Sequence, residues 1–173
     1  MAWADFTWTA IPFSVANANS YIRDNDRWVA GFSSGPKPHG VAYLTSPVGL
    51  TTTTFTVIAL DTAERDRGGG FVGGGFVCPS GGAGMYRFSG LTYTAAGQGN
   101  KELRIIRNSD ENDYCGVQNQ YGVATPAVSG LNACGEFEIA VGDTVDIALY
   151  MDDPSSFNCV YARLGWELIG VAA

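Results

Sequence analysis

From Val41 onward, hydrophobic and polar residues alternate with a period of two in short runs that turn residues separate. This period is typical of β-strands with one buried face. The pattern predicts ten strands, at residues 41–44, 53–60, 71–78, 85–94, 101–108, 115–123, 127–131, 135–140, 143–151 and 163–171. Ten short strands without an intervening helix predict an all-β sandwich.

The alternation also separates an inward face from an outward face. The inward side chains that it predicts are Tyr86, Phe88, Leu103, Ile105, Val145, Ile147, Leu149, Met151, Leu164, Trp166 and Leu168. Large side chains fall on the outward face as well: Tyr93, Ile106, Tyr114, Tyr121 and Tyr150. So many aromatic and aliphatic groups on a second face are unusual for a free monomer, so we expect them to pack between subunits.

The first 31 residues follow a different pattern. Residues 14–30 predict one helix, which Ser14 caps and Gly31 ends. The helix is either an amphipathic helix packed on the β-domain or a short bundle between subunits, with Asn25 inside its seam. Residues 1–13 predict an apolar arm with no core of its own, so we expect it to bury against another surface. The predicted attachment and trimerisation residues are Trp3, Phe6, Trp8, Ile11, Phe13, Val15, Ala18, Ile22, Asn25 and Val29.

Length and composition agree with this organisation. The chain has 173 residues, 46% hydrophobic and 16% charged, which describes one globular domain. We expect an arm and helix at 1–31, a linker at 32–40 and the β-domain at 41–173. The formal net charge of −7 argues against binding to nucleic acid. No apolar run is long enough for a membrane-spanning helix, and the N-terminus lacks the basic start of a signal peptide.

Catalytic and metal-binding patterns are absent from the sequence. His39 is the single histidine and reads as a turn residue between Pro38 and Gly40. Two groups of carboxylates have spacings that could carry chemistry. Residues 110–113 could bind calcium, and Asp152 with Asp153, or Glu136 with Glu138, could be glycosidase acids. Both groups are more simply explained as solvated turns and strand ends. We expect no enzyme activity, no metal and no cofactor.

The four cysteines at 78, 115, 134 and 159 form no C-x-x-C motif. Their spacing allows either a bridge between Cys115 and Cys134 or free thiols, and buried free thiols are the simpler expectation.

Four segments occur in an order that resembles a known family: GMYRF at 84–88, LRIIRN at 103–108, EIAVGDTVDI at 138–147 and LGW at 164–166. They are similar to signals of the complement-q-subcomponent globular head and tumour necrosis factor superfamily. The resemblance covers about residues 41–173 and implies a ten-strand jelly roll that forms a homotrimer.

The segment from Trp8 to Trp28, with ANSYIRDN at 18–25, is similar to the opening of structural proteins of tailed phages. Together the two resemblances imply a trimeric virion protein, tail-associated as a fibre, tip or minor tail protein, assembled in the bacterial cytoplasm. They imply contacts with other virion proteins and with a host-surface glycan or protein, through Tyr114, Tyr121 and Phe157. The alternatives are a capsid decoration protein and a cellular carbohydrate- or protein-binding jelly roll.

Overall fold

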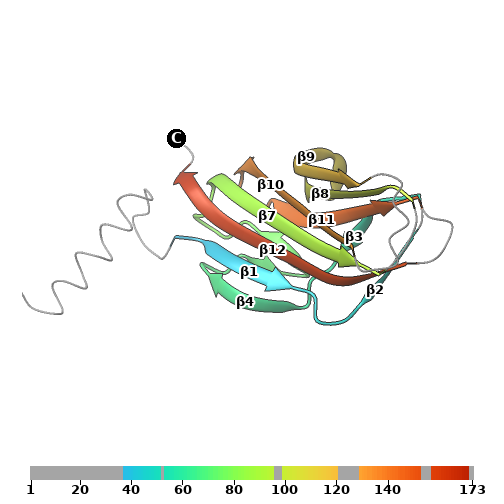
Figure 1. Ribbon diagram of the computed structural model, residues 1–173. Coiled ribbons are helices and arrows are strands. Elements are labelled where there is room, and N and C mark those ends of the chain that lie inside the picture. Colours follow the sequence, from blue (N-terminus) through green and yellow to red (C-terminus); the bar gives the residue numbers. More distant parts are fainter. Residues whose placement is uncertain (1–36, 52, 96–98, 121–128, 153–156, 172–173) are drawn as a thin grey trace, which may run out of the picture.

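The computed structural model describes residues 37–51, 53–95, 99–120, 129–152 and 157–171. These residues form two antiparallel sheets of six strands each, packed face to face (Figure 1). The prediction of an all-β sandwich is therefore confirmed, and the described residues contain no helix. The predicted helix and arm lie outside the described residues.

The first sheet has the strand order β10-β7-β12-β1-β4. Its strands are β10 (Ser129–Ile139), β7 (Gly84–Thr94), β12 (Phe157–Val171), β1 (His39–Tyr43) and β4 (Thr62–Arg67), and the short β2 (Val48–Leu50) also pairs with β12. The second sheet has the order β5-β6-β11-β8-β9. Its strands are β5 (Phe71–Val72), β6 (Gly75–Val77), β11 (Thr144–Met151), β8 (Lys101–Arg107) and β9 (Asp110–Gln120), and β3 (Thr56–Ile58) also pairs with β11.

The core lies between the sheets and contains all the inward residues that the alternation predicts, together with others that were not named, such as Phe76 and Ile58. Phe76 is in ring contact with three aromatic side chains of the first sheet, Tyr86 at 5.0 Å, Phe88 at 5.3 Å and Trp166 at 5.6 Å between centroids. Ile105, Ile147 and Leu149 are fully buried against them. Burial of each such side chain contributes roughly 1.5–3 kcal/mol, so this layer supplies the main stabilisation of the sandwich.

The strand count differs from the prediction, because the described residues form twelve strands rather than ten. Residues 127–131 and 135–140, predicted as two strands, are joined in β10, and 71–78 is divided into the hairpin of β5 and β6. Two strands were not predicted at all, β2 and β4. β4 has the sequence TAERDR and lies at the edge of its sheet, where five of its six residues are exposed. Because an exposed edge strand needs no buried face, its residues do not alternate between hydrophobic and polar, and the pattern did not predict it.

Other boundaries also differ. His39 is the first residue of β1 rather than a turn residue, and its Nδ1 lies 3.0 Å from the carbonyl oxygen of Lys37. Residues 110–113, which were expected to form a solvated turn, belong to β9. β12 begins at Phe157, six residues before the predicted start.

Candidate interaction surfaces

The residues predicted to act in attachment and host contact are only partly described. Trp3, Phe6, Trp8, Ile11, Phe13, Val15, Ala18, Ile22, Asn25 and Val29 lie outside the described residues, as does Tyr121. Phe157 starts β12 in the first sheet, where its backbone pairs with Leu50. Tyr114 lies on β9 in the second sheet and is 42% exposed. Of the three predicted host-contact residues, Tyr114 has a described side chain.

Tyr114 belongs to a cluster on the outward face of the second sheet. Its ring centroid lies 4.6 Å from the guanidinium carbon of Arg104, and the ring of Phe55 lies 4.3 Å from the same carbon. Phe55 in turn contacts Tyr150, with 5.3 Å between ring centroids. A guanidinium held by two aromatic rings is a favourable cation–π arrangement. We call Phe55, Arg104, Tyr114 and Tyr150 the arginine–aromatic cluster.

Arg104 is held in this position by two polar contacts. Its Nε donates to the carboxylate of Glu102, two residues earlier on β8, and its Nη1 donates to the carbonyl oxygen of Glu111 at 2.6 Å. These contacts join the start of β9 to β8, since Glu111 belongs to β9. The cluster is therefore a fixed surface feature rather than a set of independent side chains.

The cluster lies on the face that carries Ile106 and Ala148, which are 1% and 0% exposed. Both point away from the main core, and Ile106 was expected to be available for subunit packing. That expectation is wrong for Ile106, because side chains of the same chain bury it. Tyr114 pairs with it on β9, and Asp146 pairs with it on β11. A residue that the alternation places on the outward face of a strand is therefore not necessarily exposed to solvent.

The outward face of the first sheet differs in character. Tyr93 and Tyr161 are in ring contact at 5.9 Å between centroids, and Tyr93 is 40% exposed. The Tyr93 ring also lies against Gly130, where a β-carbon would be 2.7 Å from Cε1. Salt bridges cross this face, from Arg87 to Glu136 at 2.9 Å and from Lys37 to Glu167 at 3.3 Å. It is a mixed face, with exposed aromatic groups and charges that are paired within the chain.

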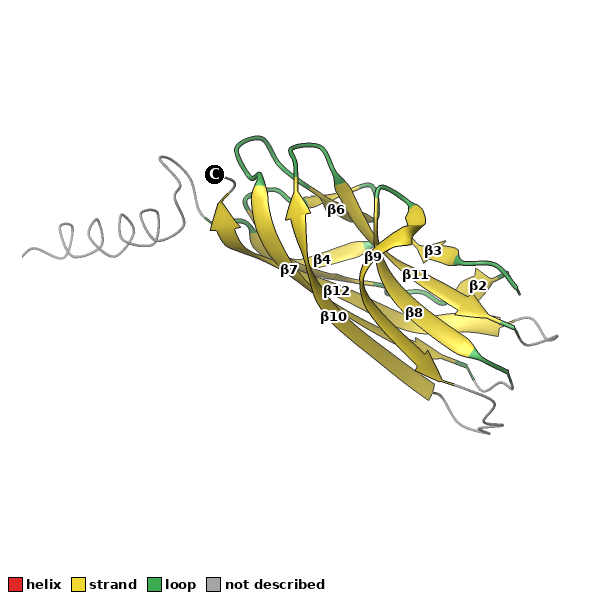
Figure 2. Ribbon diagram, turned by 90° about the horizontal axis from the view of Figure 1, so that it is seen from above, coloured by secondary structure: helices red, strands yellow, loops and turns green. Residues whose placement is uncertain are grey.

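The two sheets approach each other closely where β9 lies beside β10 (Figure 2). A β-carbon on Gly135 would lie 1.8 Å from the carbonyl oxygen of Cys115, and one on Gly116 would lie 2.9 Å from the backbone of Cys134. Gln118 accepts a hydrogen bond from the backbone N–H of Asn132 at the same edge. Two glycines therefore let the strands touch through their backbones.

All four cysteines are free thiols. Burial raises the pKa of Cys115 to about 12 and that of Cys159 to about 11, and it also raises the pKa of Cys78. Cys134 is exposed on the outward side of β10, whereas Cys115 packs against the core. The favoured expectation of free thiols agrees with this arrangement.

Four of the acidic residues considered as ligands or catalysts make structural contacts through their carboxylates, and Asp153 lies outside the described residues. Asp152 accepts hydrogen bonds from both the N–H and the side-chain amide of Asn100, and Glu136 pairs with Arg87. Asp110 accepts from the N–H of Asn112, and Asp113 lies 2.7 Å from Nε of Arg107. Within the described ranges, no group of three or more histidine, cysteine, aspartate or glutamate side chains is arranged to hold a metal ion. The same part of the chain contains no helix that could span a membrane.

No family model and no curated protein matches the sequence. Solved structures do match the fold. The globular domain of zebrafish complement 1qA protein aligns with a TM-score of 0.56 and 17% identity, over 77% of this chain and 97% of that one. Vertex protein P5 of phage PRD1 aligns with a TM-score of 0.54 and 14% identity, over 78% of this chain and 99% of that one. The Eiger TNF of S. frugiperda aligns with a TM-score of 0.50 and 12% identity, over 79% of this chain and 96% of that one. The chain therefore has the jelly-roll fold of the tumour necrosis factor and complement 1q proteins, a fold that also occurs in a phage vertex protein.

Proposed function

We propose that this protein is a homotrimeric, non-catalytic structural component of a virion. In this proposal it is tail-associated, residues 1–31 attach it to other virion proteins, and the jelly roll projects outward. The observation that carries the proposal is the jelly roll itself, which aligns over nearly the whole length of a phage vertex protein. Fold likeness alone does not fix function, so the proposal needs its own tests.

The homotrimer is supported by the type of fold. The tumour necrosis factor and complement 1q proteins that share it are homotrimers. Three identical heterologous contacts close a ring and leave no unpaired interface. The exposed Tyr93 on the first sheet and the exposed Tyr114, Val57 and Val117 on the second sheet are available apolar groups for such contacts.

The non-catalytic role is supported by the contacts of the acidic side chains. The pairs considered as glycosidase acids include Asp152 and Glu136, which are engaged by Asn100 and Arg87. A general acid or base must instead be available to a reacting group. The contacts of Arg104 with Glu111 and of Arg107 with Asp113 join neighbouring strands, as structural contacts do.

Light scattering on the full chain tests the trimer. We expect three times the 18.3 kDa mass of one chain at micromolar concentration. A mass of one chain would contradict self-association and would leave a monomeric binding module as the better explanation.

Deletion of residues 1–31 tests the attachment role. The remainder should stay folded and soluble but no longer join the particle. If the shortened protein unfolds, the arm belongs to the core of its own subunit. If it folds and still assembles, attachment lies elsewhere on the sandwich.

Locating the protein in the particle separates the tail-associated role from capsid decoration. We expect antibody labelling at the tail. Labelling of the head would favour decoration, and absence from every particle, together with binding on a glycan array, would favour the cellular binding module.

A further inference from the structure

The outward face of the second sheet holds a half-buried carboxylate without a donor. Asp146 lies on β11 between Val145 and Ile147, which belong to the core, so its side chain points to the opposite face. Its oxygens accept no hydrogen bond from the described residues, yet neither oxygen is fully buried. Burial raises the pKa of Asp146, so the surrounding chain desolvates this carboxylate without compensating it. A donor from outside the chain would restore the lost hydrogen bonds.

A donor lies beside this acceptor. Asp146 is opposite Ile106 in the register of β11 and β8, and Arg104 lies two residues from Ile106 on the same face. Diagonal neighbours of this kind are about 7–8 Å apart, so their side chains can reach one ligand. Nε and Nη1 of Arg104 are used within the chain, whereas its Nη2 donates to no described residue and is not fully buried.

Tyr114 adds an apolar surface next to both groups. It is opposite Ile106 on β9, its ring centroid lies 4.6 Å from the guanidinium carbon of Arg104, and it is 42% exposed. An exposed ring beside fixed polar groups can pack on the apolar side of a ligand while the polar groups orient it.

The charges select the class of ligand. Because Arg104 is already paired with Glu102, the carboxylate of Asp146 gives the site a net negative charge, which disfavours anions. A cation would lie beside the guanidinium of Arg104. A protein partner fits poorly, since charged residues are depleted at the centre of protein interfaces. A neutral sugar satisfies all three groups, because hydroxyls both donate and accept and the ring has an apolar side.

We propose that Asp146, Arg104 and Tyr114 form a binding site for a neutral carbohydrate. One hydroxyl donates to the carboxylate of Asp146, another accepts from Nη2 of Arg104, and the sugar ring packs on Tyr114. The site requires that no other subunit covers this face, so subunit contacts must use the first sheet. It holds for a virion protein and for a cellular binding module alike, so its failure would leave the proposed function standing.

A printed array of neutral, sialylated and sulfated glycans tests the site with the full chain. We expect the protein to bind neutral glycans, and the glycan bound most strongly is then titrated in solution by calorimetry. Absence of binding to every neutral glycan, or binding confined to sialylated and sulfated glycans, would overturn the proposal.

Variants of the full chain test which residues bind. Asp146→Asn and Tyr114→Leu should each weaken the affinity by about tenfold or more. The matched controls are Glu138→Gln and Tyr93→Leu, an exposed carboxylate and an exposed tyrosine of the first sheet, and their affinity should be unchanged. Unchanged affinity in the Asp146 or the Tyr114 variant, or an equal loss in the controls, would contradict the site.

Stability and mass separate binding from a structural role. Asp146→Asn removes a desolvated charge and should be at least as stable as the unsubstituted protein in urea at pH 7, so its loss of affinity cannot come from unfolding. Tyr114→Leu keeps an apolar side chain over Ile106, and circular dichroism checks its fold. Light scattering should give both variants the mass of the unsubstituted protein. A changed mass would place the residue in a subunit contact and would overturn the proposal.

Discussion

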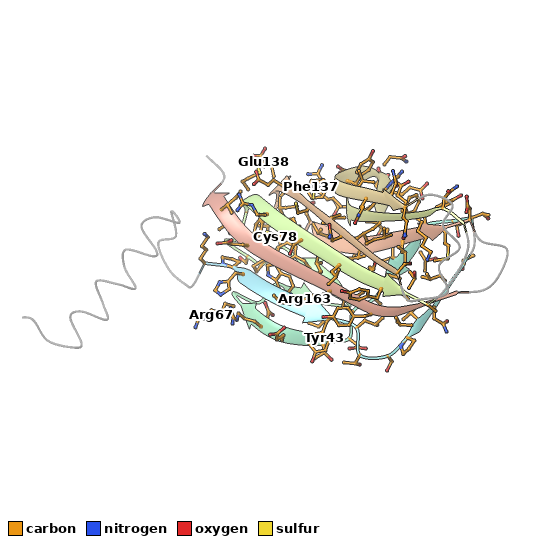
Figure 3. The ribbon with its side chains drawn as sticks, viewed as in Figure 1. Tyr43, Arg67, Cys78, Phe137, Glu138 and Arg163 are labelled. Carbon is orange, nitrogen blue, oxygen red and sulfur yellow. The ribbon has the colours of Figure 1, made fainter. Side chains whose placement is uncertain are left out.

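The guanidinium of Arg107 lies over the ring of Phe137, 5.2 Å from its centroid, and so joins β8 of one sheet to β10 of the other (Figure 3 labels Phe137). The same guanidinium donates to Asp113 on β9 at 2.7 Å and to the carbonyl oxygen of Glu138 at 2.9 Å. One side chain thus connects three strands at the edge where the two sheets meet. Asp113 is the main cause of the raised pKa of Arg107.

Replacing Arg107 with Met should therefore destabilise the protein. The variant keeps an apolar side chain over Phe137 but loses the cation–π contact and both hydrogen bonds, which together should cost about 1–3 kcal/mol. Urea unfolding measures the change. Arg163→Met is the matched control, because its Nη2 lies 3.9 Å from Glu64 and both side chains are well exposed, so its cost should be under about 1 kcal/mol. Equal effects of the two substitutions would show that the Arg107 contacts are not special.

Gly135→Ala should be among the most destabilising single-methyl additions in the molecule. The new β-carbon would overlap the carbonyl oxygen of Cys115 at 1.8 Å, so β9 or β10 must move. Overpacking of this kind typically costs about 1–3 kcal/mol. Gly49→Ala is the control, since its β-carbon would have the side-chain oxygen of Asn158 at an ordinary 3.8 Å. A neutral Gly135→Ala variant in thermal unfolding would mean that the strands are not in backbone contact.

The sequence was sufficient for the sandwich because the long inner strands alternate cleanly. In β7, every second residue from Gly84 to Thr94 is buried. The residues between them are exposed, apart from the half-buried Leu91. Such strands are recognised from their own residues alone, since their inward side chains meet one common core. The edge strands β2 and β4 lack this signal, because they bury too little for a pattern to form.

The gap predicted at 132–134 and the exposure expected of Ile106 have a common physical origin. Residues 132–134 were left between two predicted strands, but they pair without interruption with β7, where Asn132 lies opposite Leu91 and Cys134 opposite Ser89. The alternation along β8 places Ile106 on the outward face, but residues of other strands cover it. In both cases a tertiary contact overrides the local pattern. The arginine–aromatic cluster was missed for the same reason, because Phe55, Arg104 and Tyr150 are far apart along the chain.

The thiols should differ strongly in reactivity in the folded protein. Cys134 is exposed and should be alkylated by iodoacetamide within minutes, whereas the half-buried Cys115, with a pKa of about 12, should react far more slowly, and the buried Cys159, with a pKa of about 11, should react only after unfolding. Mass spectrometry of the modified peptides distinguishes the sites. We also expect reductant to leave the melting temperature unchanged. A fall of about 10 °C would indicate a structural disulfide and would contradict the free thiols.

Asp146→Asn should raise the stability at neutral pH, and the gain should disappear on acidification. Burial raises the pKa of Asp146, whose Oδ1 lies so close to Gly75 that a β-carbon there would be 2.0 Å away. A folded-state pKa above the unfolded value of about 3.9 means that stability falls as pH rises from that value through the folded-state pKa. The asparagine variant does not ionise, so its advantage is complete above the raised pKa and absent below about pH 3.9.

Asp143→Asn is the control of opposite sign, because hydrogen bonds from Asn108 and Ala140 lower the pKa of Asp143. That substitution should destabilise at pH 7, and the loss should shrink as pH falls through the lowered pKa. Urea unfolding of both variants between pH 7 and pH 3 measures the two trends, and parallel pH dependence in the two variants would contradict the assignment for Asp146.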